Sequence, residues 1–230
     1  MARFVRFQKM ITNDNWKCLQ RSTVLVVGVG GVGGYAVEAL ARSGVGKLIL
    51  VDDDIVDETN INRQLIALTS TLGMKKTAAW RKRIQDINPL CRVVLYDMFY
   101  QTENKDVIFQ EPIDYVIDAC DTIESKKLLI LECLQRKIPI LSCMGTGNKL
   151  DPSQLYIADI RKTNYDPLAR ILRKWVKEEK IKEKILVLCS HEQPIKTDGR
   201  TPASSAFVPS SAGLLIASYV VCDLFNKKEN

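Results

Sequence analysis

Paired cysteines are missing from this 230-residue sequence. Its seven cysteines include no C-x-x-C pair, so a zinc site with the usual four-thiolate spacing is excluded. The N-terminus lacks the apolar segment of a signal peptide, and we therefore expect an intracellular protein without a disulfide framework. Most of the thiols are expected to be small core residues. Histidine occurs only once, at His191.

Long hydrophobic runs are also missing. No stretch approaches the roughly 18 unbroken apolar residues of a spanning helix. A hydrophobic content of 46% with 26% charged residues is typical of globular chains and excludes disordered and collagen-like proteins. We predict a cytoplasmic protein with no membrane partner. The mostly apolar helix expected within residues 207–225 is assigned to the core or to a dimer interface.

Short apolar runs rich in β-branched residues alternate with segments of helical periodicity. This alternation predicts an α/β fold with a doubly wound, Rossmann-like, mostly parallel sheet, extended by additional C-terminal strands and helices. The expected strands are residues 23–27, 47–51, 92–96, 114–118, 138–142, 155–160 and 185–189. The expected helices are a single one within the first 21 residues, then 35–42, 75–88, 125–136, 167–179 and 211–225.

A glycine-rich turn joins the first expected strand to the following helix. Gly28, Gly30 and Gly33 form the pattern G-x-G-x-x-G. Glycine lets the backbone turn sharply and approach an anion closely, and the helix N-terminus presents free N–H groups to phosphate. Asp52, at the end of the second expected strand, is placed to accept hydrogen bonds from ribose hydroxyls. The segment therefore predicts nucleotide binding.

Charged residues after Asp52 suggest that the nucleotide is a triphosphate. Arg63 and Lys76 would place fixed positive charge beside phosphate, although each by itself reads equally as surface charge. Asp121 follows the fourth expected strand, at the edge where open sheets bind ligands. Its carboxylate is expected either to hold Mg²⁺ against phosphate oxygens or to cap a helix N-terminus, and the two roles are compatible.

Two further features lie in the C-terminal third. Residues 161–184 hold nine Lys or Arg against four Asp or Glu, a local excess of five within a chain whose net charge is +6. This segment is either a solvated helix face or a contact surface for a polyanion. Cys189 and His191 would point the same way from a strand. They suggest a Cys–His nucleophile or, as we expect, a buried cysteine beside a loop histidine.

Four motifs resemble the adenylating family of ubiquitin-activating enzymes and their bacterial relatives. They are GVGGVGG, VDDDIVDETNINRQ, GMKK and DACD, in that order, and the similarity covers residues 3 to about 145. The resemblance implies that Gly31 lies against the phosphates, that Asp52 holds the ribose and that Asp121 binds metal and nucleotide. It also implies phosphate contacts from Asn60, Arg63 and Lys76. The opening Arg3-Phe4-x-Arg6 resembles the family segment whose second arginine, here Arg6, acts in the partner subunit's site.

The C-terminal third is similar to one group in that family, the bacterial tRNA threonylcarbamoyladenosine dehydratases. The similarity lies in GTGNKLDPSQLYIADIRKTNYDPLARILRK and AFVPSSAGLLIAS. It implies one adenylating domain over residues 1–230, with a nucleotide-binding core at 1–150 and a substrate and dimer part at 151–230. The implied cofactors are ATP and Mg²⁺, and the implied partners are a second copy of the chain and tRNA carrying threonylcarbamoyladenosine. A cysteine desulfurase system is a further partner that the resemblance leaves open.

The implied reaction is an ATP-dependent dehydration. The threonyl carboxylate attacks the α-phosphate of ATP, and the neighbouring ureido group then closes a ring by displacing AMP, so no enzyme nucleophile is required. The main alternative is an adenylyltransferase that activates the C-terminal carboxylate of a small sulfur-carrier or ubiquitin-like protein. The missing C-x-x-C pairs and the basic segment argue against it. A nucleotide-sensing protein with a decayed site and an NAD-dependent oxidoreductase are the remaining alternatives.

Overall fold

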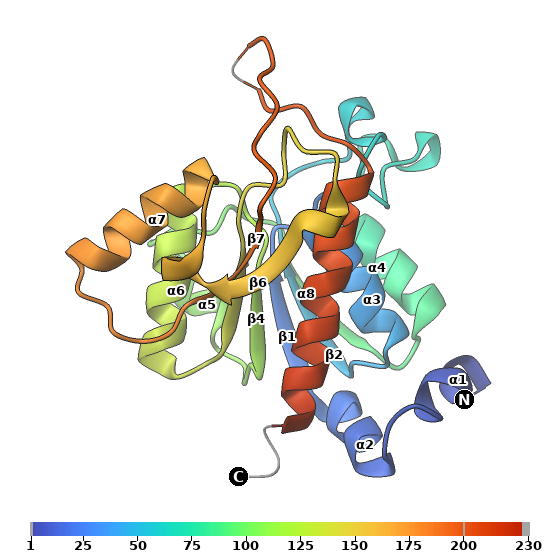
Figure 1. Ribbon diagram of the computed structural model, residues 1–230. Helices are drawn as coiled ribbons and strands as arrows, with labels where there is room; N and C mark the ends of the chain where they lie inside the picture. Colours follow the sequence, from blue (N-terminus) through green and yellow to red (C-terminus); the bar gives the residue numbers. More distant parts are fainter. Residues whose placement is uncertain (1, 200, 227–230) are drawn as a thin grey trace.

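A single seven-stranded sheet organises the chain. The computed structural model describes residues 2–199 and 201–226, and in this structure the strand order is β3-β2-β1-β4-β5-β7-β6 (Figure 1). Every neighbouring pair is parallel except β7 and β6, which run antiparallel at the edge. The strands are β1 (Thr23–Val27), β2 (Lys47–Val51), β3 (Arg92–Tyr96), β4 (Tyr115–Asp118), β5 (Ile140–Cys143), β6 (Leu155–Asp159) and β7 (Leu186–Ser190).

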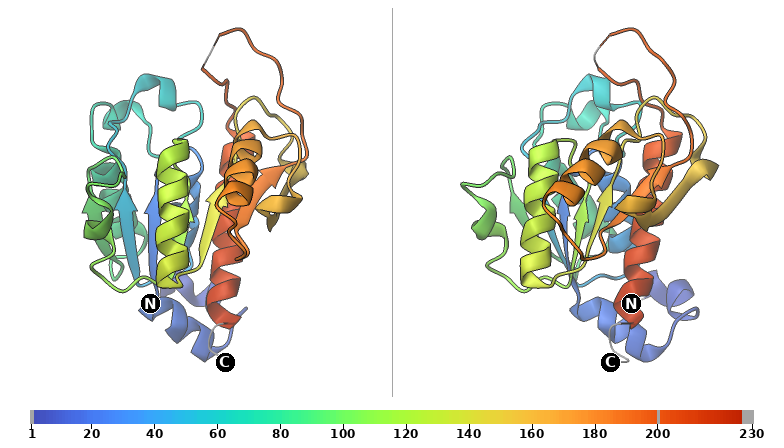
Figure 2. Two further views of the ribbon diagram at one scale, coloured as in Figure 1. Left: turned by 90° about the vertical axis from the view of Figure 1, so that its left-hand side faces the viewer. Right: turned by 60° about the vertical axis from the view of Figure 1, so that its left-hand side comes forward.

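Helices cover both faces of this sheet (Figures 1 and 2). The longer ones are α2 (Asn13–Arg21), α3 (Gly33–Arg42), α4 (Lys76–Ile87), α6 (Ile123–Arg136), α7 (Pro167–Glu178) and α8 (Phe207–Asn226). Short helices occur at α1 (Val5–Gln8) and α5 (Lys105–Ile108), and 3₁₀ turns at η1 (Ala2–Phe4), η2 (Glu58–Asn60), η3 (Thr69–Thr71), η4 (Pro152–Gln154) and η5 (Ile160–Lys162). The doubly wound α/β fold predicted from the sequence is confirmed.

The central strands supply both hydrophobic cores. Along β1, Val24 and Val26 belong to the core beneath α3, α4 and α8, whereas Leu25 and Val27 belong to the core beneath α6 and α7. Successive side chains of a strand point to opposite faces, so a strand between two helical layers must be apolar at every position. This requirement explains the unbroken apolar run at residues 23–27, all of which are buried.

The largest differences from the predicted boundaries lie near the two ends of the chain, and the other element ends shift by at most two residues. The first 21 residues do not form one helix, because α1 ends at Gln8 and α2 begins again at Asn13. Thr12 caps the new helix, its side-chain oxygen accepting a 3.1 Å hydrogen bond from the Asn15 N–H. At the other end, α8 begins at Phe207, four residues before the predicted start. Pro209 lies within its first turn, where a missing N–H breaks no helical hydrogen bond.

Helix α8 packs along α3. Gly213 permits this close approach, because a Cβ atom at that position would lie 2.2 Å from the Val32 carbonyl oxygen. The helix is long and apolar enough to cross a membrane by length and composition alone, but half of its most apolar window is buried within the protein. Such burial is what a core helix of a globular domain shows, as the sequence predicted. Because β6 and β7 extend the same sheet, the C-terminal third shares its core with the first 150 residues.

Candidate functional site: a nucleotide cleft at the carboxyl edge of the sheet

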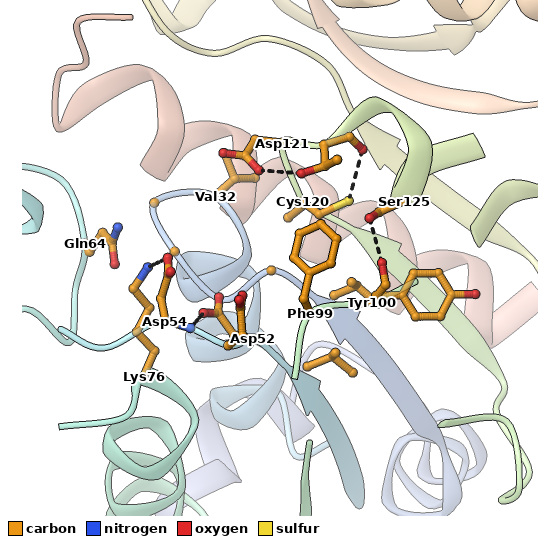
Figure 3. Close-up of a pocket in the computed structure, with 18 of the residues that line it drawn as sticks. Val32, Asp52, Asp54, Gln64, Lys76, Phe99, Tyr100, Cys120, Asp121 and Ser125 are labelled. Carbon is orange, nitrogen blue, oxygen red and sulfur yellow. Dashed lines mark hydrogen bonds and ion pairs between the residues drawn. The ribbon is translucent and has the colours of Figure 1, made fainter. Parts of the chain in front are cut away.

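A cleft of about 310 Å³ opens where β1, β2 and β4 end (Figure 3). In open parallel sheets this edge, on either side of the first strand, is where ligands bind. The cleft is lined by eight of the residues expected at the site: Gly28, Gly30, Gly31, Asp52, Asn60, Arg63, Lys76 and Asp121. Two expected residues, Gly33 and Arg6, do not line it.

The glycine loop is built around backbone contacts that side chains would block. Gly28 has φ = +82°, and a Cβ there would lie 2.7 Å from the Ala119 carbonyl oxygen. A Cβ on Gly33 would lie only 1.8 Å from the Gly28 carbonyl oxygen, so this residue allows α3 to start directly against the loop. Gly33 therefore packs behind the loop and does not line the cleft, and its contact with a nucleotide stays a prediction.

Asp52 ties the glycine loop to the segment after β2. Its carboxylate accepts hydrogen bonds from the Val29 N–H at 2.8 Å and from the Asp54 N–H at 3.0 Å. Burial raises the pKa of Asp52, while the positive charge of Lys76 acts in the opposite direction. Each carboxylate oxygen can accept more than one hydrogen bond, so Asp52 can hold the loop and still receive a ribose hydroxyl.

Lys76 is the most enclosed cation of the cleft, with 4% of its surface exposed. It is the first residue of α4, and its Nζ lies 2.6 Å from Oδ2 of Asp54, whose side chain is exposed. Sequence reasoning missed Asp54, because nothing in the run Asp52-Asp53-Asp54 distinguishes the third aspartate from its neighbours. The ion pair aims the ammonium at the cleft, where a phosphate would compete with Asp54 for it (Figure 3).

The loop between β2 and α4 carries the other two polar residues predicted to meet phosphate. The Asn60 Oδ1 accepts a hydrogen bond from the Asp57 N–H at 3.1 Å and so closes the turn of η2. Arg63 donates through Nη1 to the Thr59 carbonyl oxygen and to Asn62. Both side chains are thus oriented by their own loop, and Arg63 keeps donors free for an anion because guanidinium carries five N–H groups.

Gln64 is a residue of the cleft that was not assigned a role from the sequence. It is buried, and within the described residues its Oε1 has no hydrogen-bond partner. Buried polar atoms without partners are uncommon in folded proteins and often mark functional positions. The cleft also has an apolar wall that includes Val27, Met98 and Phe99, a surface suited to a nucleobase. Together these features fit a nucleotide with its phosphates on the loop.

Asp121 lies at the mouth of the cleft, between β4 and α6. The N-cap of α6 is Thr122, and no side chain caps this helix, so the capping role considered for Asp121 is wrong. Its exposed carboxylate accepts a 3.4 Å hydrogen bond from the Thr122 hydroxyl. On the opposite side of the loop, carboxylate oxygens of Asp52, Asp53 and Asp54 lie within 4.8 Å of one another. These are the oxygen ligands that Mg²⁺ prefers, and they fit a cation bound with polyphosphate.

A buried ion pair supports the segment that carries Asp121. Lys126 of α6 and Asp118 at the end of β4 have no exposed side-chain surface, and their charged atoms lie 3.0 Å apart. Lys126 also donates to the Cys143 carbonyl oxygen, and Ser142 donates to Asp118 at 2.6 Å. Burial, the largest single cause, acts to lower the pKa of Lys126, but the charge and hydrogen bond of Asp118, together with the nearby Cys120 and Cys143, raise the pKa overall. Asp118 Oδ1 in turn accepts from the Cys120 N–H.

Neither Cys120, which lines the cleft, nor Cys189, the cysteine considered as a nucleophile, has an activated thiol. Burial and the nearby Asp118 carboxylate raise the pKa of Cys120, which stabilises the thiol against the thiolate. Burial also raises the pKa of Cys189. Among the described residues His191 stacks on Tyr156 and forms no hydrogen bond with Cys189, so the expectation of a buried cysteine beside a loop histidine agrees with the structure.

Arg6 lies outside the cleft of its own chain. It is exposed on α1, which packs near α2 at the end of the sheet opposite the glycine loop (Figure 1). An arginine at that position cannot reach the nucleotide of the same protomer without unfolding of the N-terminus. A role for Arg6 in catalysis therefore requires a second chain.

Comparison with known proteins identifies the relatives of this chain. The sequence model of the ThiF family matches residues 1–190. The chain belongs to the ThiF family. A tRNA threonylcarbamoyladenosine dehydratase of Bacillus subtilis is 47% identical to this ThiF-family chain, over 100% of its length and 97% of the relative. Crystal structures of the Escherichia coli dehydratase TcdA in complex with AMP and with ATP superpose with TM-scores of 0.93 and 0.92. Both are 33% identical and cover 98% of this chain and 95% of the solved one. The resemblance drawn from the sequence is confirmed.

The buried Asp118–Lys126 ion pair leads to a prediction about the stability of this ThiF-family chain. Lys126→Met should lower the free energy of unfolding by about 3–5 kcal/mol, because it leaves the Asp118 carboxylate buried and unpaired. Lys127→Met is the matched control on the same helix, since Lys127 pairs with Glu124 at the surface and should change stability by less than about 1 kcal/mol. Urea unfolding at one fixed protein concentration measures both. Equal effects would show that the pair contributes nothing specific.

Proposed function

We propose that this chain is an ATP-dependent tRNA threonylcarbamoyladenosine dehydratase. The observation that carries the proposal is the cleft itself, which places Arg63, Lys76 and Asp121 around a glycine loop able to receive phosphates. Relatives similar over nearly the whole chain are dehydratases, and one has been crystallised with ATP. A hydride-transfer enzyme needs no such cationic cluster beside its cofactor phosphates.

The reaction begins with charge neutralisation. A carboxylate of the substrate approaches the α-phosphate of ATP, and two anions repel unless fixed positive charge lies between them. Lys76 and Arg63 supply that charge from the loop after β2, and backbone N–H groups of the glycine loop add to it. Mg²⁺ held by Asp121 would neutralise the departing pyrophosphate. Attack then forms an acyl-phosphate bond and releases pyrophosphate.

Ring closure follows within the substrate. The ureido nitrogen attacks the activated acyl carbon, loses its proton and displaces AMP, which carries away the carboxylate oxygen. The net change in the nucleoside is the loss of one water. Because the nucleophile and the acyl group belong to one molecule, their high effective concentration makes an enzyme nucleophile unnecessary. The raised thiol pKa values of Cys120 and Cys189 agree with such a mechanism.

The activity is tested by incubating the protein with ATP, Mg²⁺ and tRNA carrying threonylcarbamoyladenosine. Mass analysis of the nucleosides should show loss of one water, together with AMP formation that depends on the tRNA. Asp121→Asn should abolish both while leaving the thermal unfolding midpoint within a few degrees of the wild type. AMP formation driven instead by the C-terminal carboxylate of a small carrier protein would favour the alternative function.

The position of Arg6 leads to a proposal of catalysis across a homodimer. Its guanidinium would enter the cleft of a partner copy and stabilise the charge that develops on the phosphates. Arginines supplied in this way contribute about 10³–10⁵ in rate in other phosphoryl-transfer systems. Two identical subunits that exchange N-terminal segments would form a symmetric, isologous pair.

Mixed dimers test this arrangement. Arg6→Ala and Lys76→Ala should each abolish AMP formation as homodimers. In a mixture of the two, each heterodimer contains one cleft with its own Lys76 and a partner's Arg6, so part of the activity should return. Mass spectrometry of intact complexes verifies that heterodimers have formed. Verified heterodimers that remain inactive would mean that Arg6 does not act in trans.

The basic segment at 161–184 is proposed to contact the tRNA backbone. Two of its arginines have structural partners: Arg161 pairs with Asp159 and donates to the Ile181 and Glu183 carbonyl oxygens, and Arg173 donates to Thr163. Arg170 and Lys174 are exposed one turn apart on α7, and the side chain of Lys174 lies 3.7 Å from Glu178. They are therefore available to phosphate oxygens.

Reversal of these two charges has a measurable consequence. The double variant Arg170→Glu and Lys174→Glu should weaken tRNA binding, and the dependence of log Kd on log salt should flatten by about one unit for each lost phosphate contact. The matched control is Arg21→Glu with Lys17→Glu, which has the same residue types and spacing on α2 at the far end of the sheet. If the two double variants bind tRNA with the same affinity and the same slope of log Kd against log salt, the α7 face is only a solvated surface.

A further inference from the structure

Three aromatic side chains that do not line the nucleotide cleft lie near the start of α7 and the end of β7. Tyr165, directly before the Asp166 N-cap of α7, is 60% exposed. His191 stacks on Tyr156 with ring centroids 3.9 Å apart and planes 9° from parallel. We call Tyr156, Tyr165 and His191 the aromatic ledge. None of them takes part in the adenylation chemistry described above.

The ledge lies at the same edge of the sheet as the glycine loop. His191 directly follows the end of β7, and Tyr156 of β6 pairs with Cys189 near that end. The Asn164 N–H donates to the Tyr156 hydroxyl at 3.4 Å, which connects the stacked pair to the segment that carries Tyr165. In Figure 1, α7 begins at the same end of the molecule as α6, which follows Asp121.

A second buried ion pair fixes the ledge to the cleft. Asp166 and Lys149 are each 1% exposed, with charged atoms 3.2 Å apart, and Lys149 also donates to the Gly145 carbonyl oxygen at 2.6 Å. The next residue, Thr146, lines the nucleotide cleft. These contacts connect the segment that carries Tyr165 to a residue of the cleft wall.

Tyr165 adopts a backbone conformation that tyrosine disfavours. Its φ is +57°, in the left-handed region where glycine and asparagine are tolerated and a bulky side chain is strained. An exposed tyrosine at such a position buries little surface in return. Asparagine or glycine at this position would remove the backbone strain. The tyrosine therefore costs some stability, and a function of its ring would explain its presence there.

We propose that the aromatic ledge stacks an unpaired base of the tRNA loop while the modified adenosine occupies the cleft. The proposal rests on the function proposed above and names a subsite for its substrate. Single-stranded RNA is recognised through bases that stack on aromatic rings, with cations along the backbone. The exposed Arg170 and Lys174 lie in the first and second turns of α7, which begins two residues after Tyr165, and they supply that second component.

Substitutions at Tyr165 separate the ring from the backbone. Tyr165→Asn keeps the left-handed conformation and removes the ring; its thermal unfolding midpoint should equal or exceed that of the wild type. Its Kd for tRNA carrying threonylcarbamoyladenosine, measured by filter binding without ATP, should rise roughly tenfold. Tyr165→Phe, which keeps the ring, should restore most of this affinity. Leu90→Asn, an exposed apolar residue beyond the end of α4, is the control and should leave the Kd unchanged.

Two results would overturn the ledge. One is a Tyr165→Asn protein that binds tRNA as tightly as the wild type, and the other is a Tyr165→Phe protein as weak as Tyr165→Asn. The Kd is measured without turnover, so these outcomes differ from a failure of the proposed function. The proposed function could fail separately. If the Kd changes with the Tyr165 variants as expected but the wild type removes no water from the nucleoside, the dehydratase assignment is contradicted and the ledge is supported.

Discussion

The Asp118–Lys126 ion pair is the interaction on which the site depends. It joins the end of β4, the first turn of α6 and the end of β5 in a region that water does not reach. Bringing two charges out of water costs several kcal/mol for each ion, and only close pairing with further hydrogen bonds offsets that cost. The Ser142 hydroxyl and the Cys143 carbonyl supply these hydrogen bonds. The loop that carries Asp121 is therefore attached to a buried ion pair whose hydrogen bonds are satisfied in one geometry.

A similar pair stands beneath the neighbouring loop. Lys149 and Asp166 connect the segment after β5 to the start of α7. Asp121, one of the side chains proposed to act in catalysis, sits on a loop, which is the mobile kind of segment in an α/β fold, and that loop is held by the buried pair beneath it. The buried pairs fix the backbone of these segments, so exposed side chains on them can change their contacts without moving the backbone.

Much of the fold could be predicted because the central strands are buried on both faces. Residues 23–27, 47–51 and 92–96 were predicted to the residue, since apolar runs bounded by polar or glycine residues permit no other register. The helix breaks were harder. Thr12 caps α2 within a segment that was predicted to be one continuous helix, and Pro209 lies in the first turn of α8, where the sequence placed it before the helix. At both places the local sequence is compatible with more than one structure, and packing decides between them.

The site was predictable where a motif carried it and not where tertiary contacts did. Glycine spacing and the charged positions after β2 indicated the cleft, because phosphate chemistry demands those residue types. Asp54, Gln64 and Lys126 carry no such pattern. Their roles arise from partners elsewhere in the chain, 22 residues away for the Asp54–Lys76 pair, and a single sequence contains no record of those distances. Gly33 shows the converse, since its motif position implied a ligand contact and its surroundings show packing against Gly28.

Asp54 gives Lys76 a resident counterion, so the nucleotide binding proposed for this lysine would be an exchange of anions. The carboxylate is largely exposed and returns to water at little cost when a phosphate displaces it. What the lysine gains is only the difference between the two anions. That difference would be larger for a triphosphate than for the single phosphate of AMP, so the return of Asp54 to the ammonium would ease the release of AMP in the proposed reaction.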